Sequence, residues 1–332
     1  MIRLILLAVQ VAALVVGPVP ASPSVVAPSS ALPIEGYLMD ADGAIGHLEA
    51  NIAAISIVGV DGVTLTRSGG GLTATPDIAV EAIALAHRNG KKAELLLSNY
   101  SESLGDFSPA IAKRLLTSTR HRAAVVKALV ARVKKYGFDG VQVDLESLKP
   151  SYAAGLTAFV KQLRKALPRS KRISMAVMAS STVKGYKNAG YQLTKLRRVV
   201  SRFVLMAYDQ HGPGWSSAGP VGGTPWVQQV LAGFIRAKVR RSQIDLGVAQ
   251  YGYSWPADGT PGTSLSVAQA RALAGDRAVF DTTQQEWTAT LADGTLLWWS
   301  DRDTLTARRQ LAADQGLHGL AVWELSLADP LP

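Results

Sequence analysis

Three polar side chains occupy alternate positions in a short, otherwise apolar run: Gln142, Asp144 and Glu146. Side chains alternate between the two faces of a β-strand, so these three would share one face and the apolar residues between them the other. Two carboxylates on one face of a low-dielectric site repel each other, which raises the pKa of one of them. A carboxylic acid that stays protonated near neutral pH is the proton donor that glycoside hydrolysis requires.

A solvated pair of acids at a fraying strand end is the plain alternative. The apolar opposite face and the presence of Gln142 on the polar face favour side chains that point inward instead. Enzymes built on parallel barrels hold their reactive groups at the C-terminal ends of the strands, where Asp144 and Glu146 would lie.

Short apolar runs alternate with longer segments of helical spacing along the chain, and this pattern must position the acids. Strands are expected at 34–39, 52–60, 92–98, 141–145, 173–179, 203–208, 244–251 and 320–323. Helices are expected at 77–89, 119–136, 152–167, 227–239 and 303–315. Strands that are apolar on both faces and separated by helices predict a parallel sheet covered by helices, and eight of them predict a (β/α)8 TIM barrel. An open doubly wound sheet is the alternative.

Residues 255–300 break this alternation. Two alternating runs, 287–291 and 295–299, flank the turn sequence Ala292-Asp293-Gly294. This pattern predicts a β-hairpin. We therefore expect a small insertion with a hairpin between the seventh and eighth strands.

The N-terminal residues carry the features of an export signal. A basic start, an apolar run from Leu4 to Val16 and small residues ending at Ala21 predict a cleaved signal peptide over 1–21. An uncleaved anchor is the alternative, although the apolar run is short for a bilayer span. Residues 22–32 are rich in Pro, Ser, Ala and Val and predict a flexible linker, which leaves 33–332 for the barrel.

The formal net charge of +10 favours anionic surroundings without choosing among them. Pairs of cations near helix ends indicate solvated faces rather than a track for nucleic acid. The five histidines show no metal-binding spacing, so neither a metal nor another cofactor is expected.

The segment Asp139-Gly140-x-Gln142-x-Asp144-x-Glu146 resembles the DGxDxDxE signature of glycoside hydrolase family 18, the chitinase-like barrels. Gln142 stands where many members have Asp, and a bacterial branch similar to spore-cortex and cell-wall N-acetylglucosaminidases has an amide there. Other segments resemble the same branch, in order along the chain: 92–101, 205–211, 219–226, 252–255 and 320–323.

The resemblance implies a role for each matching residue. Glu146 would be the acid/base, and the 2-acetamido oxygen of the substrate would be the nucleophile. Asp144 would hold the acetamide N–H, Tyr208 would orient the same group, Asp209 would contact the sugar, and Trp323 would form the floor beneath it. Gln142 is expected to donate a hydrogen bond that keeps Asp144 ionised.

Three further residues are expected to line the substrate site: Asp139 within the motif, and Tyr37 and Asn99 at strand ends. Together these features predict an exported or wall-associated monomer that cleaves β-linked N-acetylglucosamine glycans, with peptidoglycan ahead of chitin. A glycan-binding lectin on the same barrel is the non-enzymatic alternative, which the presence of Glu146 disfavours. No membrane contact is expected after signal cleavage.

Overall fold

The computed structural model describes residues 32–332, so the expected signal peptide and all but the last residue of the expected linker lie outside the described residues. None of the described helices has the length and hydropathy of a membrane span. Leu32–Pro332 forms one structural unit.

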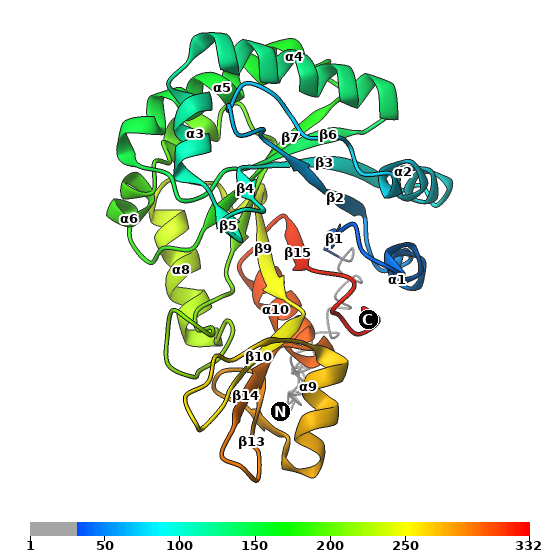
Figure 1. Cartoon of the computed structure of the whole chain (residues 1–332), viewed down its shortest axis with the longest axis vertical. Coiled ribbons are helices and arrows are strands. Elements are labelled where there is room, and N and C mark those ends of the chain that lie inside the picture. Colours follow the sequence, from blue (N-terminus) through cyan, green and yellow to red (C-terminus); the bar gives the residue numbers. More distant parts are fainter. Residues whose placement is uncertain (1–31) are drawn as a thin grey trace, which may run out of the picture. The chain divides into compact units, whose positions relative to one another are not determined.

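Eight parallel strands close into a barrel in the order β1-β15-β9-β8-β7-β6-β3-β2 (Figure 1). The predicted TIM barrel is thereby confirmed, and the open sheet is wrong. The strand that carries Asp144 is the fourth along the chain. The strands are β1 (Ile34–Leu38), β2 (Ile57–Thr64), β3 (Lys92–Ser98), β6 (Gly140–Asp144), β7 (Arg172–Met178), β8 (Arg202–Met206), β9 (Ile244–Ala249) and β15 (Gly319–Trp323).

The helices lie around the outside of this barrel (Figure 1). The longest begins where the Ser118 hydroxyl accepts a hydrogen bond from the His121 N–H, and it ends at Gly137, whose φ of 87° favours glycine. The helices around the barrel are α1 (Ala44–Asn51), α2 (Ile78–Arg88), α3 (Pro109–Leu116), α4 (Thr119–Tyr136), α5 (Ala153–Ala166), α6 (Val183–Asn188), α7 (Leu193–Leu196), α8 (Thr224–Arg236) and α10 (Arg302–Asp314).

The second strand starts later than expected. Residues 52–56 follow the short helix α1 as turn and coil, and β2 begins only at Ile57. The sequence gives little sign of α1, because its N-cap, Gly43, offers no side-chain cap.

The inward faces of the strands carry a buried polar layer. The Arg202 guanidinium lies 2.7 Å from Glu35, 2.9 Å from Glu94 and 2.6 Å from Asp245, measured between nitrogen and carboxylate oxygen. Gln142 joins this layer by donating to both oxygens of Glu35, at 3.2 and 3.0 Å. Buried charges are tolerated where they are paired and hydrogen-bonded, so this layer fixes the barrel interior below the catalytic end.

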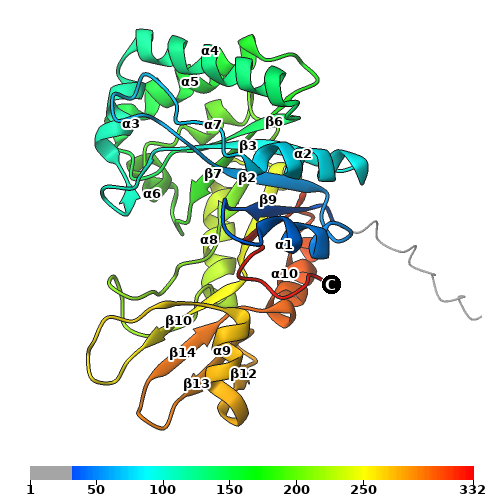
Figure 2. The ribbon, with the colours of Figure 1, turned by 45° about the vertical axis from the view of Figure 1, so that its right-hand side comes forward.

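The insertion is larger than the predicted hairpin. It forms a five-stranded sheet in the order β11-β10-β14-β13-β12, with α9 packed on it (Figure 2). The pairing of β13 with β14 confirms the hairpin, but β10 starts at Tyr251, so the strand expected at 244–251 is divided between barrel and insertion. The elements are β10 (Tyr251–Trp255), β11 (Ser264–Ser266), α9 (Val267–Ala274), β12 (Val279–Asp281), β13 (Glu286–Thr290) and β14 (Leu296–Trp299).

Buried Glu286 on β13 attaches the insertion to the loop that follows β8. Its carboxylate accepts hydrogen bonds from the N–H groups of Val221 and Gly222, at 2.7 and 2.8 Å, and from the Ser300 hydroxyl, at 2.8 Å. Charge-assisted bonds to backbone donors are strong and directional, so the insertion and this loop are held in one arrangement.

Candidate active site

The two acids lie together at the C-terminal end of the fourth barrel strand. Asp144 is the last residue of β6 and is only 6% exposed, and partly buried Glu146 follows two residues later. The two carboxyl groups lie close enough to share a hydrogen bond when one of them is protonated. Because carboxylates both accept, this bond requires a proton on one of them.

Burial and neighbouring charges decide which acid holds that proton. Burial, followed by the negative charge of Asp61, raises the pKa of Asp144 to about 7, while the hydrogen bond from Glu146 lowers it. The pKa of Glu146 is raised well above its usual value, first by burial and then by the charges of Asp144, Asp209 and Asp106. The proton therefore belongs to Glu146, and Asp144 is the member that ionises first.

The backbone of Glu146 is held by the side chain of Asn99, which follows β3. The Glu146 N–H donates to Asn99 Oδ1 at 2.8 Å, and Asn99 Nδ2 donates to the carbonyls of Glu146 and Ser108, both at 3.1 Å. Asn99 is fully buried and its amide is committed to these bonds. It was expected to contact substrate; the structure instead makes it a positioning residue.

Tyr208 and Asp209 follow β8 on the other side of the acids. Burial raises the pKa of the Tyr208 hydroxyl, and the charges of Asp209, Asp144 and Glu146 contribute, so this hydroxyl stays protonated beside them. The hydroxyls of Tyr251 and Tyr253 donate to Asp209 Oδ1 at 2.6 and 2.8 Å. Two residues of the insertion thus orient Asp209.

Trp323 ends β15 and is partly buried. The ring of Tyr37 lies beneath it, with centroids 5.2 Å apart. Tyr37 is 2% exposed and donates to Gln142 Oε1 at 2.7 Å. It was expected to line the substrate site; its buried position instead makes it a support for Trp323.

Gln142 also differs from expectation. Its amide nitrogen donates to Glu35 and to Ser174 Oγ, and its oxygen accepts from Tyr37, so no donor is left for Asp144. In residues 32–332, Asp144 Oδ1 is buried without a hydrogen-bond partner. The expectation that Gln142 donates to Asp144 is wrong, because its long side chain reaches the barrel layer below.

Asp139 lies at the opposite end of β6. Its carboxylate accepts from His87 at 2.8 Å and from the Ala93 N–H at 3.1 Å, and Lys92 and Lys171 lie within 3.5 and 3.9 Å. The expectation that Asp139 lines the substrate site is wrong, since a strand separates it from Glu146.

Several residues around the acids were not anticipated. Asp61 on β2 is close enough to raise the pKa of Asp144. The pKa of Asp61 is itself raised by burial, with a smaller contribution from the charge of Glu324, directly after Trp323. A single acid inside an apolar strand was the available signal for Asp61. Tyr251 and Tyr253 alternate on one strand, which could have marked them as a pair on one face.

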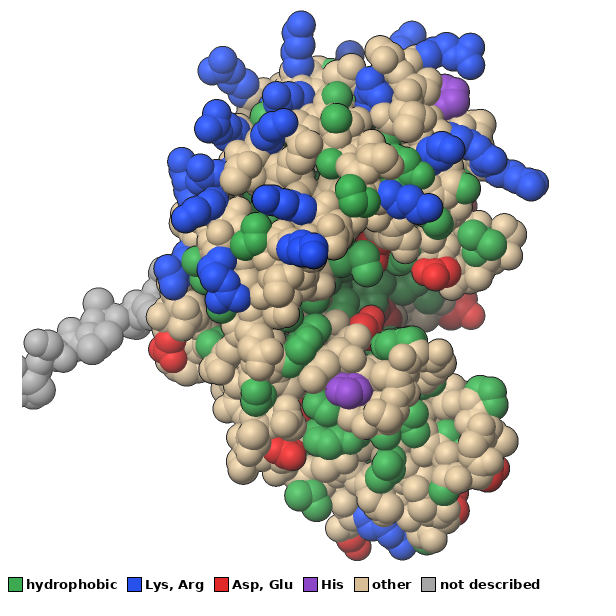
Figure 3. Space-filling view, turned by 90° about the vertical axis from the view of Figure 1, so that its left-hand side faces the viewer, with side chains coloured by type: hydrophobic (Ala, Val, Ile, Leu, Met, Phe, Trp, Pro, Cys, Tyr) green, Lys and Arg blue, Asp and Glu red, His purple; other side chains and the backbone are tan. Residues whose placement is uncertain are grey.

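A hollow lies between the barrel and the insertion, with apolar and acidic side chains inside it (Figure 3). Trp215 is 56% exposed and stands edge-on to Tyr253, with ring centroids 5.7 Å apart, whereas Trp226 packs on the core. In the described part of the chain, no group of three or more His, Asp or Glu side chains is arranged to hold a metal.

Comparisons with known proteins agree with this geometry. A glycosylase of Bacillus subtilis described as uncharacterized, YvbX, is 23% identical over 75% of each chain. The cortical fragment-lytic enzyme of the same organism is 24% identical over 68% of this chain, which spans only 55% of that enzyme.

Among solved structures, a chitinase from Chromobacterium violaceum superposes with a TM-score of 0.80 at 25% identity, covering 90% of this chain and 96% of that one. The family model for glycosyl hydrolases family 18 matches residues 79–328. The chain is therefore a glycosyl hydrolase of family 18.

Proposed function

We propose that this protein is an exported retaining hydrolase that cleaves β-linked N-acetylglucosamine glycans, with peptidoglycan as its substrate. The observation that carries the proposal is the Asp144–Glu146 pair, in which Glu146 keeps a proton and Asp144 ionises first. That arrangement supplies one acid and one anion within a single sugar site.

Glu146 acts first as the acid and then as the base. Its proton passes to the glycosidic oxygen while the bond from that oxygen to C1 breaks and the acetamido carbonyl oxygen attacks C1 from the opposite face. Ionised Asp144 accepts the acetamide N–H and stabilises the oxazolinium ion that forms. Glu146 then removes a proton from water, which opens the ring at C1, so two displacements retain the anomeric configuration.

The surrounding residues restrict where the sugar lies. The Tyr208 hydroxyl remains protonated and can donate to the acetamide oxygen, which aligns it for attack. Trp323, supported by Tyr37, offers an apolar floor.

Two observations favour peptidoglycan over chitin. A relative along most of this barrel is named for lysis of cortical fragments. In the site region of the described chain, Trp215 is the one large aromatic side chain that is well exposed, which does not make the long aromatic groove that a chitin chain would need.

Digestion of purified peptidoglycan and of chitin, followed by mass analysis of the released fragments, tests the assignment. We expect N-acetylglucosamine-terminated fragments from peptidoglycan, released by wild type and not by Glu146→Gln. NMR of the first product should show the β-anomer. Binding of both glycans without release of reducing ends would instead support the lectin alternative, and faster release from chitin would reassign the substrate.

Export remains part of the proposal, since residues 1–31 lie outside the described residues. N-terminal sequencing of protein recovered from culture supernatant should begin after Ala21. Recovery of the full-length chain in the membrane fraction would support an anchor instead.

A further inference from the structure

Positive charge is concentrated in one part of the chain. Residues 109–201 contain 20 Lys and Arg but only three acids, Asp139, Asp144 and Glu146. This segment builds α3 through α7, and Figure 3 shows Lys and Arg side chains gathered over the upper part of the molecule, where Figure 1 places α3, α4 and α5. The exposed cations of residues 109–201 thus contribute to one basic face over these helices.

The charges of this basic face are not neutralised by the protein itself. Among the cations at 109–201, all of them described, only Lys171 lies within 4.0 Å of a carboxylate, that of Asp139. Asp144 and Glu146 are turned into the catalytic site. Lys127 and Lys134 on α4, and Lys161 and Lys165 on α5, are exposed to solvent.

Lysines on these helices have a regular spacing. Lys127 and Lys134 are seven residues apart, about 10 Å along α4, and Lys161 and Lys165 are four apart, about 6 Å along α5. The flexible ammonium groups of Lys at such intervals suit a polymer that carries one negative charge in each repeat unit. Specific recognition of a carboxylate more often uses the paired N–H donors of an Arg guanidinium. Several arginines here, including Arg122 and Arg164, are instead bonded to backbone carbonyls.

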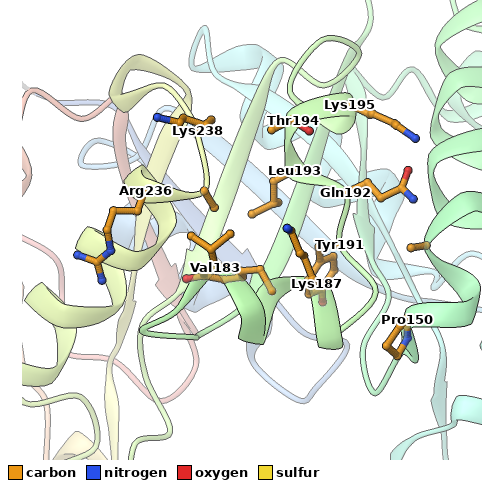
Figure 4. A pocket seen from close by; sticks show the side chains of 13 residues that line it. Pro150, Val183, Lys187, Tyr191, Gln192, Leu193, Thr194, Lys195, Arg236 and Lys238 are labelled. Atoms are coloured by element: carbon orange, nitrogen blue, oxygen red, sulfur yellow. The ribbon is translucent and has the colours of Figure 1, made fainter.

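A pocket of about 580 Å³ extends the basic face beyond α5. Apolar side chains such as Val183 and Leu193 line its interior, and Lys187, Lys195 and Lys238 stand on it, with Lys195 and Lys238 on opposite sides (Figure 4). None of the described residues that line it is acidic. It offers the repeat unit of a polymer a small recess with cations around it.

We propose that this basic face binds a linear phosphodiester-linked polyol polymer of the cell envelope, which holds the enzyme beside its glycan. The choice of partner rests on the proposed function. Peptidoglycan is part of the cell envelope, so a polymer of the envelope would lie beside it. Nucleic acid fits less well: no aromatic side chain between 109 and 201, a segment described throughout, is exposed for stacking on bases.

The test uses the full mature chain and purified poly(glycerol phosphate) as the probe. We expect binding whose affinity falls steeply with salt, and the triple variant Lys127→Gln/Lys134→Gln/Lys165→Gln should reduce the slope of log K against log salt by about two to three. The matched control Arg88→Gln/Arg277→Gln/Arg302→Gln removes the same charge from exposed positions outside the face and should leave the slope unchanged. Lys187→Gln/Lys195→Gln tests the pocket and should also weaken binding.

Binding and hydrolysis are separated by two further measurements. Glu146→Gln should bind the polymer like wild type, and the triple variant should cleave a soluble oligosaccharide at the wild-type rate but lose activity on intact walls. Equal weakening by the control variant, or no binding at 50 mM salt, would overturn the proposal. Tighter binding to duplex DNA or to polygalacturonate than to poly(glycerol phosphate) would overturn the choice of partner. The binding measurements do not depend on whether the enzyme hydrolyses peptidoglycan, so they test the polymer site separately from the proposed activity.

Discussion

Asp61→Asn is expected to move the acidic limb of the activity profile to lower pH. The active form needs Asp144 ionised, and the pKa of Asp144 is raised from 3.8 to about 7. Wild-type kcat/KM should therefore fall as the pH drops below about 7. Burial is the larger cause of the rise and the Asp61 charge the next, so removing that charge should return about one pH unit of it.

The direction of this shift follows because the enzyme is active when Asp144 is ionised. With the neighbouring negative charge gone, Asp144 loses its proton at a lower pH, so Asp61→Asn stays active where wild type has begun to fail. The assay is kcat/KM against pH on a soluble N-acetylglucosamine oligosaccharide, since this ratio reports the free enzyme.

Asp106→Asn provides the matched control, because the Asp106 charge raises the pKa of Glu146 and is not among the causes for Asp144. Its acidic limb should stay in place while its basic limb moves to lower pH, since Glu146 would then lose its proton earlier. If Asp61→Asn leaves the acidic limb unchanged, or shifts it upward, ionisation of Asp144 does not set that limb and the assignment of roles within the pair fails.

Three other changes test the supports of the site. Asn99→Ala removes the hydrogen bonds that hold the Glu146 backbone and should lower kcat about tenfold to a hundredfold, with a smaller change in KM. A rise in KM as large as the fall in kcat would contradict a positioning role. Gln142→Glu adds a carboxyl beside Glu35, and the pKa of this new carboxyl in the folded state should exceed its unfolded value of about 4.3. Thermal stability relative to wild type should therefore fall as the pH rises through that folded pKa. A stability difference that does not change with pH would refute this. Arg202→Met leaves three buried carboxylates without their cation and should lower the free energy of unfolding, measured with urea, by about 3–5 kcal/mol. An unchanged free energy of unfolding would show that these carboxyl groups are already protonated.

The barrel could be predicted from sequence because its signal is local and repeated. Each strand is an apolar run bounded by helical spacing, and a strand face is fixed by alternation alone, which is how Asp144 and Glu146 were placed together. Errors arose where the local signal was weak. The helix α1 lacks a capping side chain, so the apolar stretch after it was attached to β2.

The partners of individual side chains could not be predicted in this way. Gln142 shares a strand face with Asp144, but its hydrogen bonds go to Glu35 and Tyr37, which are more than 100 positions away in the sequence. Asn99 was placed at the correct end of β3, yet nothing in its residue type says that its amide faces a backbone and not a sugar. The prediction that Asp139 lines the substrate site could have been excluded from the sequence. Asp139 lies seven residues before Glu146, which is about 23 Å along an extended strand.

The glutamine at position 142 separates two sets of charges that would otherwise meet. Below it, Glu35, Glu94 and Asp245 are balanced by Arg202 in the barrel interior. Above it, Asp144 Oδ1 has no hydrogen bond to that layer, and the pKa of Asp144 is raised first by burial and then by the charge of Asp61 on β2. Because Gln142 cannot carry a proton, protonation of the interior layer cannot pass through this position to the reacting acids. The acidic limb of the pH profile is then set by the burial of Asp144 and by the charge of Asp61 on β2, apart from the interior layer.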